Sequence, residues 1–189
     1  MTIETKRLRP ELWKDLENLF GQNGACGGCW CMSWRRTKGE NWEDMKGYPN
    51  KKRFKRLVVS GMAHGVLAYD EGEPIGWCSF DRRQDYSKLD RSPSLKCDDS
   101  AEVWSIPCFF IKKDYRGQGV GTLLLSEAVK AIKDLGGKIA EGYPTKPYNY
   151  GNSIPAAFAW TGTNQMFKKL MFKPVGKKDG SKQRMRLSI

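Results

Sequence analysis

The sequence predicts one α+β domain built on a mixed β-sheet. Segments with strand and helix patterns follow one another irregularly along the 189 residues, in the order β-α-α-β-β-β-α-β-α-β-β. A chain of this length usually forms one domain, and no internal repeat or low-complexity linker divides it. Hydrophobic residues make up 39% of the chain and charged residues 29%, a balance typical of folded globular proteins. We therefore expect residues 1–189 to form a single domain.

The first elements are a short strand and two helical regions. Weak alternation predicts a strand over residues 3–8, and Pro10 suits the first turn of the helix that follows, in which apolar residues recur at helical spacing. Glycines end this helix, so residues 21–40 are expected to form a loop rich in cysteine and tryptophan. A second helical region covers residues 42–59 and is interrupted near Pro49.

The middle of the chain predicts three strands. Residues 64–70 and 73–81 are apolar runs joined by the turn-forming sequence DEGEP, which indicates a β-hairpin. Residues 84–100 are polar and contain a proline, so they are expected to form a loop. Residues 102–111, EVWSIPCFFI, are the stretch richest in strand-forming residues.

The last third of the chain predicts two helices and three strands. Residues 122–135 continue an amphipathic helix with polar residues on one side. Its apolar stripe is expected to consist of Val120, Leu124, Ala128, Ala131 and Leu135. Residues 138–144 predict a strand, and Thr163 is placed to cap a short helix over residues 164–170. Two further strands are expected within residues 172–189.

The chain is strongly basic, with a formal net charge of +12. Basic residues concentrate in residues 51–56 and 168–186, which are either solvated surface or a field that attracts anions such as a phosphorylated cofactor or an acidic substrate. The same field disfavours a polycationic substrate. The basic stretches contain no aromatic residues in the spacing of a known nucleic-acid-binding motif, so nucleic acid is not the favoured partner.

The sequence favours a cytoplasmic protein. No apolar run approaches the ~20 residues of a transmembrane helix, and the N-terminus lacks the apolar region of a signal peptide. We therefore expect no membrane partner, and a monomer or homodimer. The six cysteines are expected to be reduced thiols.

Residues 116–121, RGQGVG, are the most informative stretch of the chain. They lie between an apolar strand and an amphipathic helix, where glycines allow backbone N–H groups to approach a ligand and the helix start carries a positive dipole end. Such a loop suits a phosphate or pyrophosphate. It is not a Walker loop, because Thr122 and Leu123 follow Gly121 in place of the lysine and hydroxyl residue. It also lacks the G-x-G-x-x-G spacing of a dinucleotide-binding fold, and instead fits R-x-x-G-x-G.

Residues 109–125, FFIKKDYRGQGVGTLLL, resemble the strand, pyrophosphate loop and helix of the GNAT superfamily of acyl-CoA N-acyltransferases. The order of elements matches that family from about Ile3 to the C-terminus, and residues 162–175, GTNQMFKKLMFKPV, are similar to its last helix and the next strand. The resemblance implies a GNAT-like fold with a central splayed mixed sheet flanked by helices. It also implies an N-acetyltransferase that uses acetyl-CoA as co-substrate. The acceptor would be a primary amine of a small, neutral or anionic molecule or of a protein.

The same resemblance implies where acetyl-CoA binds. In this family the acyl-CoA enters a gap beside the strand that precedes the loop. Backbone groups of Phe109 and Ile111 would then bind the pantetheine amides, and an amide near Phe110 would stabilise the thioester oxygen. The pyrophosphate would be held by the loop residues Arg116, Gly117, Gln118, Gly119, Val120, Gly121 and Thr122.

Attack of an amine on a thioester benefits from a general base and from an acid that protonates the leaving thiolate. Glu141 and Glu102 are the candidate bases, although either could instead pair with a lysine or arginine. The resemblance implies a tyrosine acid in the last helix, but Phe167 stands at that position, and Met171 replaces the usual glycine nearby. Tyr143 is a candidate replacement. Otherwise the thiolate leaves unaided, or the chain binds acyl-CoA and catalyses poorly.

Residues 24–36, GACGGCWCMSWRR, combine three cysteines with two tryptophans. In the family this region lines the acceptor side of the cleft. Trp30 and Trp34 would then form a flat apolar wall, and Arg35 or its neighbour would bind a carboxylate or phosphate bidentately. The competing interpretation is two core tryptophans beside surface arginines.

The spacing of Cys26, Cys29 and Cys31 raises the possibility of a metal site. These thiols supply three soft ligands, whereas structural zinc takes four, and the chain has no second CxxC or CxxH pair. We therefore expect no metal. The alternative function is a basic module that binds nucleic acid or a protein partner and holds zinc at this cluster. A catalytic cysteine is disfavoured because the sole histidine, His64, lies far away in sequence.

Overall fold

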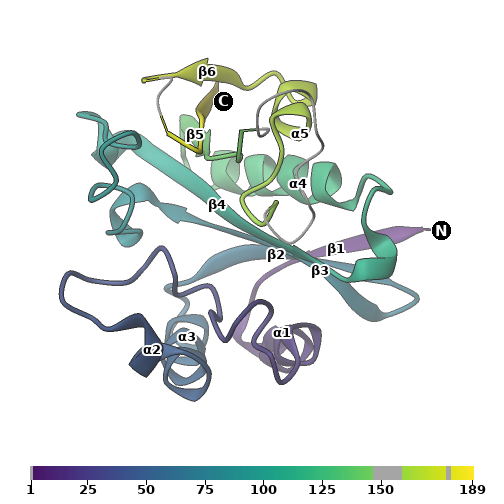
Figure 1. Cartoon of the computed structure of the whole chain (residues 1–189). Helices are drawn as coiled ribbons and strands as arrows, with labels where there is room; N and C mark the ends of the chain where they lie inside the picture. Colours follow the sequence, from purple (N-terminus) through teal and green to yellow (C-terminus); the bar gives the residue numbers. More distant parts are fainter. Residues whose placement is uncertain (1, 147–158, 178–179) are drawn as a thin grey trace.

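The computed structural model of the chain describes residues 2–146, 159–177 and 180–189. Within them, seven strands form one mixed sheet in the order β1-β2-β3-β4-β5-β7-β6 (Figure 1). The strands are β1 (Ile3–Arg7), β2 (His64–Asp70), β3 (Glu73–Arg82), β4 (Val103–Ile111), β5 (Ile139–Gly142), β6 (Lys173–Val175) and β7 (Arg184–Ser188). The pairing is antiparallel except between β4 and β5, which run parallel. The predicted α+β class with a mixed sheet is confirmed.

The helices lie between these strands along the chain, in the predicted order. They are α1 (Trp13–Phe20), α2 (Trp42–Met45), α3 (Tyr48–Val59), α4 (Val120–Asp134) and α5 (Asn164–Lys169). Short 3-10 turns are η1 (Pro10–Leu12), η2 (Arg83–Asp85), η3 (Ser100–Glu102) and η4 (Lys113–Tyr115). Thr163 caps α5 as predicted, because its side-chain oxygen accepts a hydrogen bond from the Met166 backbone N–H. In the described part of the chain, no helix is long and apolar enough to cross a membrane.

Helices cover both faces of the sheet (Figure 1). α4 packs on one face, where its apolar side chains join Cys78 and Phe80. α1 and α3 pack on the other face, with Leu67 and Trp77. Successive strand residues point to opposite faces, so β2 and β3 are buried on both sides and consist of nearly continuous apolar runs.

The β2–β3 hairpin turns over two residues. Asp70 pairs with Glu73, and the residues between them, Glu71 and Gly72, have φ angles of 49° and 83°. Two-residue hairpin turns of this kind need the left-handed conformation at both central positions, which glycine adopts readily. The turn predicted from DEGEP is confirmed.

The sheet opens beside the second half of β4. The β4–β5 pairing covers Val103 to Ile106 only, whereas β4 continues beside β3 as far as Ile111. Pro107 follows the last paired residue and has no N–H group to donate. The splayed sheet that the family resemblance implies is therefore present, and near the glycine loop it leaves one edge of β4 without a neighbouring strand.

The predicted apolar stripe of α4 is wrong at its last residue. Leu135 is 45% exposed, because α4 ends at Asp134 and the chain turns away through Gly136 in the left-handed conformation. The side chains of α4 that are buried against the sheet are Val120, Leu124, Leu125, Ala128, Ala131 and Ile132.

The cysteine-rich segment between α1 and α2 is tied to α3. The Gly28 carbonyl accepts hydrogen bonds from the Gly47 backbone N–H at 2.9 Å and from the Asn50 side-chain amide at 3.1 Å. Trp30 and Cys31 have φ angles of 42° and 56°, in the left-handed region that non-glycine residues rarely adopt. These contacts hold an unfavourable backbone conformation that turns the Cys31 side chain inward.

Candidate functional site

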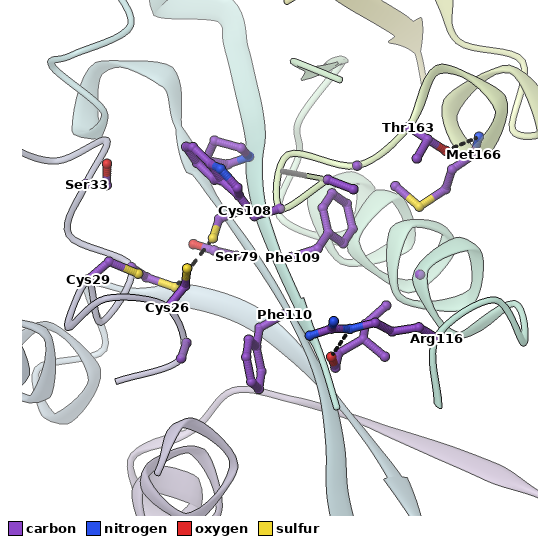
Figure 2. Close-up of a pocket in the computed structure, with 18 of the residues that line it drawn as sticks. Cys26, Cys29, Ser33, Ser79, Cys108, Phe109, Phe110, Arg116, Thr163 and Met166 are labelled. Carbon is purple, nitrogen blue, oxygen red and sulfur yellow. Dashed lines mark hydrogen bonds between the residues drawn. The ribbon is translucent and has the colours of Figure 1, made fainter. Parts of the chain in front are cut away.

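A cavity of about 700 Å³ lies between the glycine loop, the free half of β4, α5 and the cysteine-rich loop. Figure 2 shows Cys26 and Cys29 on one side, Arg116 and Met166 on the other, and Phe109 between them. The cavity is thus continuous from the region predicted to hold a pyrophosphate to the region predicted to hold an acceptor. Its volume is in the range of small-molecule sites.

Most of the residues predicted to bind the co-substrate line this cavity. They are Phe109, Phe110, Ile111, Arg116, Gly117, Gly119, Gly121 and Thr122. Two predicted residues do not line it. Val120 is the first residue of α4 and is buried in the core between that helix and the sheet. Gln118 is exposed, with its side-chain amide donating to the Asp114 carbonyl.

Two glycines of the loop are required for different reasons. Gly119 is the N-cap of α4 and has a φ angle of 87°, which only glycine adopts at little cost. Gly121 has an ordinary backbone conformation, but a Cβ atom there would lie 3.0 Å from the Met166 sulfur. The first turn of the 15-residue helix α4 therefore presents its N–H groups next to the cavity without side chains in front of them.

Backbone groups of β4 alternate in direction. The Lys112 N–H donates to the Ile75 carbonyl beside β4, while the Phe109 N–H donates to the Trp160 carbonyl, at 2.7 Å, on the other edge. By this alternation Ile111 faces the same edge as Phe109, and Phe110 directs its own N–H towards β3. On that edge the Phe109 N–H is already bonded to Trp160, and the Ile111 carbonyl accepts a hydrogen bond from Arg116 Nε at 2.9 Å. An amide that reaches a thioester from this strand would therefore belong to a neighbour of Phe110.

Glu141, the first candidate base, is buried away from the cavity. Its carboxylate is fully enclosed and contacts three guanidinium groups, with Arg83 at 3.1 Å, Arg184 at 2.9 Å and Arg186 also within hydrogen-bond distance. All three guanidinium groups bind this carboxylate in ion pairs, and Glu141 is not among the residues that line the cavity. The structure gives Glu141 the position of a buried ion-pair centre.

Glu102 and Tyr143 also lie outside the cavity lining. Glu102 is exposed and ends η3, at the opposite end of β4 from the glycine loop. The Tyr143 hydroxyl is buried, 2.7 Å from Arg83 and 2.6 Å from the Ser105 hydroxyl. Burial and the charge of Glu141 raise the pKa of Tyr143 well above its ordinary value. The structure therefore does not bring the three predicted catalytic residues together at the cavity.

Phe167 is buried at the position where the family resemblance implies a tyrosine. It packs edge-on against Phe109 and Phe172, with ring centroids 6.2 and 5.1 Å away. Its ring belongs to the apolar core and carries no proton to donate.

The two tryptophans of the cysteine-rich loop have different environments. Trp34 lines the cavity. Trp30 does not, because it packs against Trp13 and Phe20 in the core, with ring centroids 5.9 and 5.5 Å away. Of the two tryptophans predicted to form an acceptor wall, Trp34 borders the cavity and Trp30 belongs to the core.

Arg35 is buried and is not among the residues that line the cavity. It forms an ion pair with Asp81, and its guanidinium lies 4.6 Å from the centroid of the Tyr86 ring. Asp81 in turn contacts His64. The charge of Arg35 is thus compensated inside the protein, which removes it from the place where an acceptor anion was expected.

Four thiols line the cavity, and they form a soft wall. Cys31 accepts a hydrogen bond from the Trp77 indole at 3.0 Å, and its sulfur lies 4.0 Å from that of Cys108. Burial and the neighbouring Cys31 raise the pKa of Cys29 to about 12. The contact with Cys31 and burial raise the pKa of Cys108. Protonated thiols are weak nucleophiles and weak metal ligands.

No group of three or more histidine, cysteine or acidic side chains within the described ranges is arranged to hold a metal ion. The zinc-binding alternative therefore has no support from the geometry of the cysteine cluster.

Sequence reasoning missed two hydroxyl groups in the cavity wall. The Ser79 and Tyr86 hydroxyls lie 2.9 Å apart, both side chains are buried, and both residues line the cavity. Ser79 pairs with Cys108 across β3 and β4, next to Phe109. Tyr86 follows η2 in a polar segment with no periodicity, so the sequence contained no signal that it points inward.

The splayed mixed sheet, with a glycine loop at the start of α4 and a cavity beside β4, defines an acetyltransferase fold of the GNAT type. A model of the Acetyltransferase (GNAT) family matches residues 29–147, and the chain belongs to this family. No curated protein sequence matches the chain.

Several solved structures share the fold. The PaiA N-acetyltransferase from Thermoplasma acidophilum, in complex with coenzyme A, is 17% identical, with a TM-score of 0.58 over 100% of both chains. The GNAT domain of S. lividans PAT is 15% identical, with a TM-score of 0.58 over 100% of this chain and 92% of that one. A phosphinothricin acetyltransferase from Sinorhizobium meliloti, in complex with AcCoA, is 16% identical, with a TM-score of 0.57 over 100% and 89%. At these identities the likeness establishes the fold.

Proposed function

We propose that the protein is an acyl-CoA-dependent N-acetyltransferase that transfers an acetyl group from acetyl-CoA to a primary amine of a small molecule or a protein. The observation that carries this proposal is the continuous cavity of about 700 Å³, which joins the N-terminal turn of α4 to the free edge of β4 and the cysteine-rich loop. Such a cavity accommodates an extended anionic ligand and a second substrate end to end. Membership of the GNAT family supports the same activity.

The pyrophosphate of acetyl-CoA would bind at the glycine loop. Backbone N–H groups from Gly117 to Thr122 would donate to it, and the dipole of α4 would favour its charge. Arg116 lines the cavity at this end, with its Nε atom anchored on the Ile111 carbonyl at 2.9 Å. The pantetheine would then follow the free edge of β4 towards Cys108.

The acceptor amine must attack the thioester carbonyl as a neutral group. None of the described cavity-lining residues carries a carboxylate or an imidazole, so the amine would lose its proton to solvent. Its transfer into a partly apolar cavity lowers its pKa and favours the neutral form. Ser79 and Tyr86 are the hydroxyl pair positioned to donate a hydrogen bond to the departing sulfur.

Mass spectrometry of acetylated products tests this function, because six cysteines would interfere with thiol reagents that detect free CoA. The purified chain is incubated with acetyl-CoA and a panel of primary amines that includes amino acids, polyamines and peptides. We expect acetylated product from at least one class, and none from a Gly121→Glu variant, in which a carboxylate opposes the pyrophosphate. Equal product from the variant and the wild type would contradict the assigned binding mode.

A further inference from the structure

Two tryptophans from distant parts of the chain meet at the acceptor end of the cavity. Trp34 belongs to the cysteine-rich loop and Trp160 precedes α5; their ring centroids lie 5.7 Å apart, and both residues line the cavity. One lysine ammonium group lies near each ring. The Lys88 ammonium lies 5.5 Å from the Trp34 centroid, and the Lys182 ammonium lies 4.9 Å from the Trp160 centroid. Two positive charges therefore flank one aromatic pair.

Neither lysine is neutralised by a described carboxylate. Lys182 donates to the hydroxyl oxygens of Thr145 at 3.1 Å and Thr161 at 3.3 Å, which are uncharged. The ion pairs within residues 2–146, 159–177 and 180–189 include neither Lys88 nor Lys182. Arg35, the cation that the sequence suggested for this role, is paired with Asp81.

The surroundings of both lysines are positively charged and partly buried. Burial and the charge of Lys88 lower the pKa of Lys182 to about 8. Burial, Arg36 and Arg91 lower the pKa of Lys88. Positive charges that lie close together repel one another, and an anion that binds between them lowers this electrostatic repulsion. Neither lysine lines the cavity itself, but each lies near the ring of a tryptophan that does. Perturbed lysines close to a cavity indicate a binding site.

We propose that Lys88 and Lys182 form an anion-binding subsite, and that the acceptor is an amine whose apolar body lies on Trp34 and Trp160 and whose carboxylate or phosphate group binds these two lysines. This inference rests on the proposed function and names its substrate class. An anion fixed at the tryptophan pair leaves the amine at the other end of the acceptor. There it faces the free edge of β4, where the acetyl group would lie.

The subsite is tested with ligands that lack an amine and therefore cannot react. The protein is saturated with CoA and titrated calorimetrically with 3-phenylpropionate, with phenyl phosphate and with the neutral 3-phenylpropanamide. We expect saturable binding of at least one anion and at least about ten-fold weaker binding of the amide, since hydrogen bonds to charged groups are the strong ones. The two anions distinguish a carboxylate from a phosphate acceptor.

Matched variants assign the effect to the lysines. Lys182→Gln and Lys88→Gln should each weaken anion binding at least about ten-fold, and Lys182→Arg should retain most of it. Lys52→Gln removes the same charge from an exposed lysine of α3 and should have no effect. Three results would overturn the subsite. They are comparable binding of the amide and the anions, an equal loss of anion affinity in Lys52→Gln and Lys182→Gln, and no anion binding at all. Failure of CoA itself to bind would instead contradict the proposed function. A titration without CoA would then still measure how much Lys88 and Lys182 contribute to anion binding.

Discussion

Glu141 is fully buried, and its carboxylate contacts Arg83, Arg184 and Arg186. Two of these arginines come from the basic C-terminal stretch, so part of the positive charge that the sequence suggests for anion capture is used inside the fold. Arg186 also pairs with Asp99, whose carboxyl pKa this contact holds well below its ordinary value. Charges in this region stabilise the junction of β5 and β7.

The first prediction concerns this ion-pair centre. Glu141→Gln removes the shared anion of three guanidinium groups, of which Arg83 and Arg184 are buried, and should lower the free energy of unfolding by about 3–5 kcal/mol. Urea denaturation measures the change, and Glu102→Gln, at an exposed carboxylate, should change it by less than about 0.5 kcal/mol. Wild-type stability combined with lost acetyl transfer in Glu141→Gln would instead support Glu141 as the base.

The second prediction concerns the hydroxyl pair. Tyr86→Phe keeps the ring beneath Arg35 but removes the hydroxyl that contacts Ser79. We expect acetyl-CoA affinity to be retained and the rate of acetyl transfer to fall by about 100-fold, the lower end of the range of general acid–base catalysis. Calorimetry and product formation measure the two effects separately. A variant with an unchanged transfer rate would remove Tyr86 from the mechanism.

The third prediction is the pH dependence of anion binding. Lys182 is charged below its pKa of about 8, and it faces the charge of Lys88, with Arg36 and Arg91 behind that lysine. Binding of 3-phenylpropionate, which is ionised above about pH 6, should therefore be constant between about pH 6 and 7 and weaken above about pH 8, by up to ten-fold per pH unit. Lys182→Arg should flatten this decline because arginine remains charged. An equal decline in both proteins would assign the titration to another group.

At the scale of elements, the strands and helices were predictable because their signals are local. The two-residue hairpin turn, the Thr163 cap and the glycine start of α4 each depend on neighbouring residues only. The environment of Glu141 depends instead on arginines more than 40 residues away in the chain. The strand pattern indicated that Glu141 lies in the sheet but could not indicate which charges surround it.

The cysteine-rich loop shows the same limit. Trp30 and Trp34 lie in an irregular segment without helical or strand periodicity, so the sequence could not separate the core residue from the cavity residue. Trp160, Tyr86 and Lys88 reach the cavity region only through long-range contacts. The glycine loop at one end of the cavity was predictable from one motif, whereas the end proposed to hold the acceptor is formed by residues from distant segments of the chain.

The fourth prediction concerns the packing of this loop. A Cβ atom on Gly28 would lie 2.5 Å from the Gly47 backbone nitrogen, whereas one on Gly27 would meet nothing within 4 Å. Both glycines have positive φ angles, 72° and 55°, so the alanine variants share the backbone cost. Gly28→Ala should therefore be less stable than Gly27→Ala by about 1–3 kcal/mol. It should also weaken the binding of the anion probes at the proposed acceptor end of the cavity. Equal stabilities in urea would show that the loop is not held against α3.

At the scale of the whole molecule, one cavity is lined by segments from distant parts of the chain. The sequence indicated some of these segments and not others, and they differ in charge. Its α4 end presents backbone N–H groups, and its middle is lined by thiols, hydroxyls and aromatic rings. At its far end the Trp34 and Trp160 rings each lie near a lysine that pairs with no carboxylate among the described residues. A net charge of +12 fits an enzyme whose two ligands are both anionic. The long-range field would then attract acetyl-CoA and its acceptor to the same opening.

The central claim is that acetyl-CoA binds in this cavity with its pyrophosphate at the glycine loop. Calorimetric titration of the chain with acetyl-CoA tests it most directly, with Gly121→Glu, Gly121→Ala and Gln118→Glu measured alongside. We predict one site with micromolar affinity, ~−8 kcal/mol, for the wild type, and at least about 100-fold weaker binding for Gly121→Glu. Gly121→Ala should lose much less affinity than Gly121→Glu, because it adds no charge and its Cβ would meet only the flexible Met166 side chain, 3.0 Å from the sulfur, and Ile111. Gln118→Glu should stay near the wild type, because the Gln118 side chain donates to the Asp114 carbonyl and does not line the cavity. Absence of binding by the wild type, or equal binding by Gly121→Glu, would contradict the account.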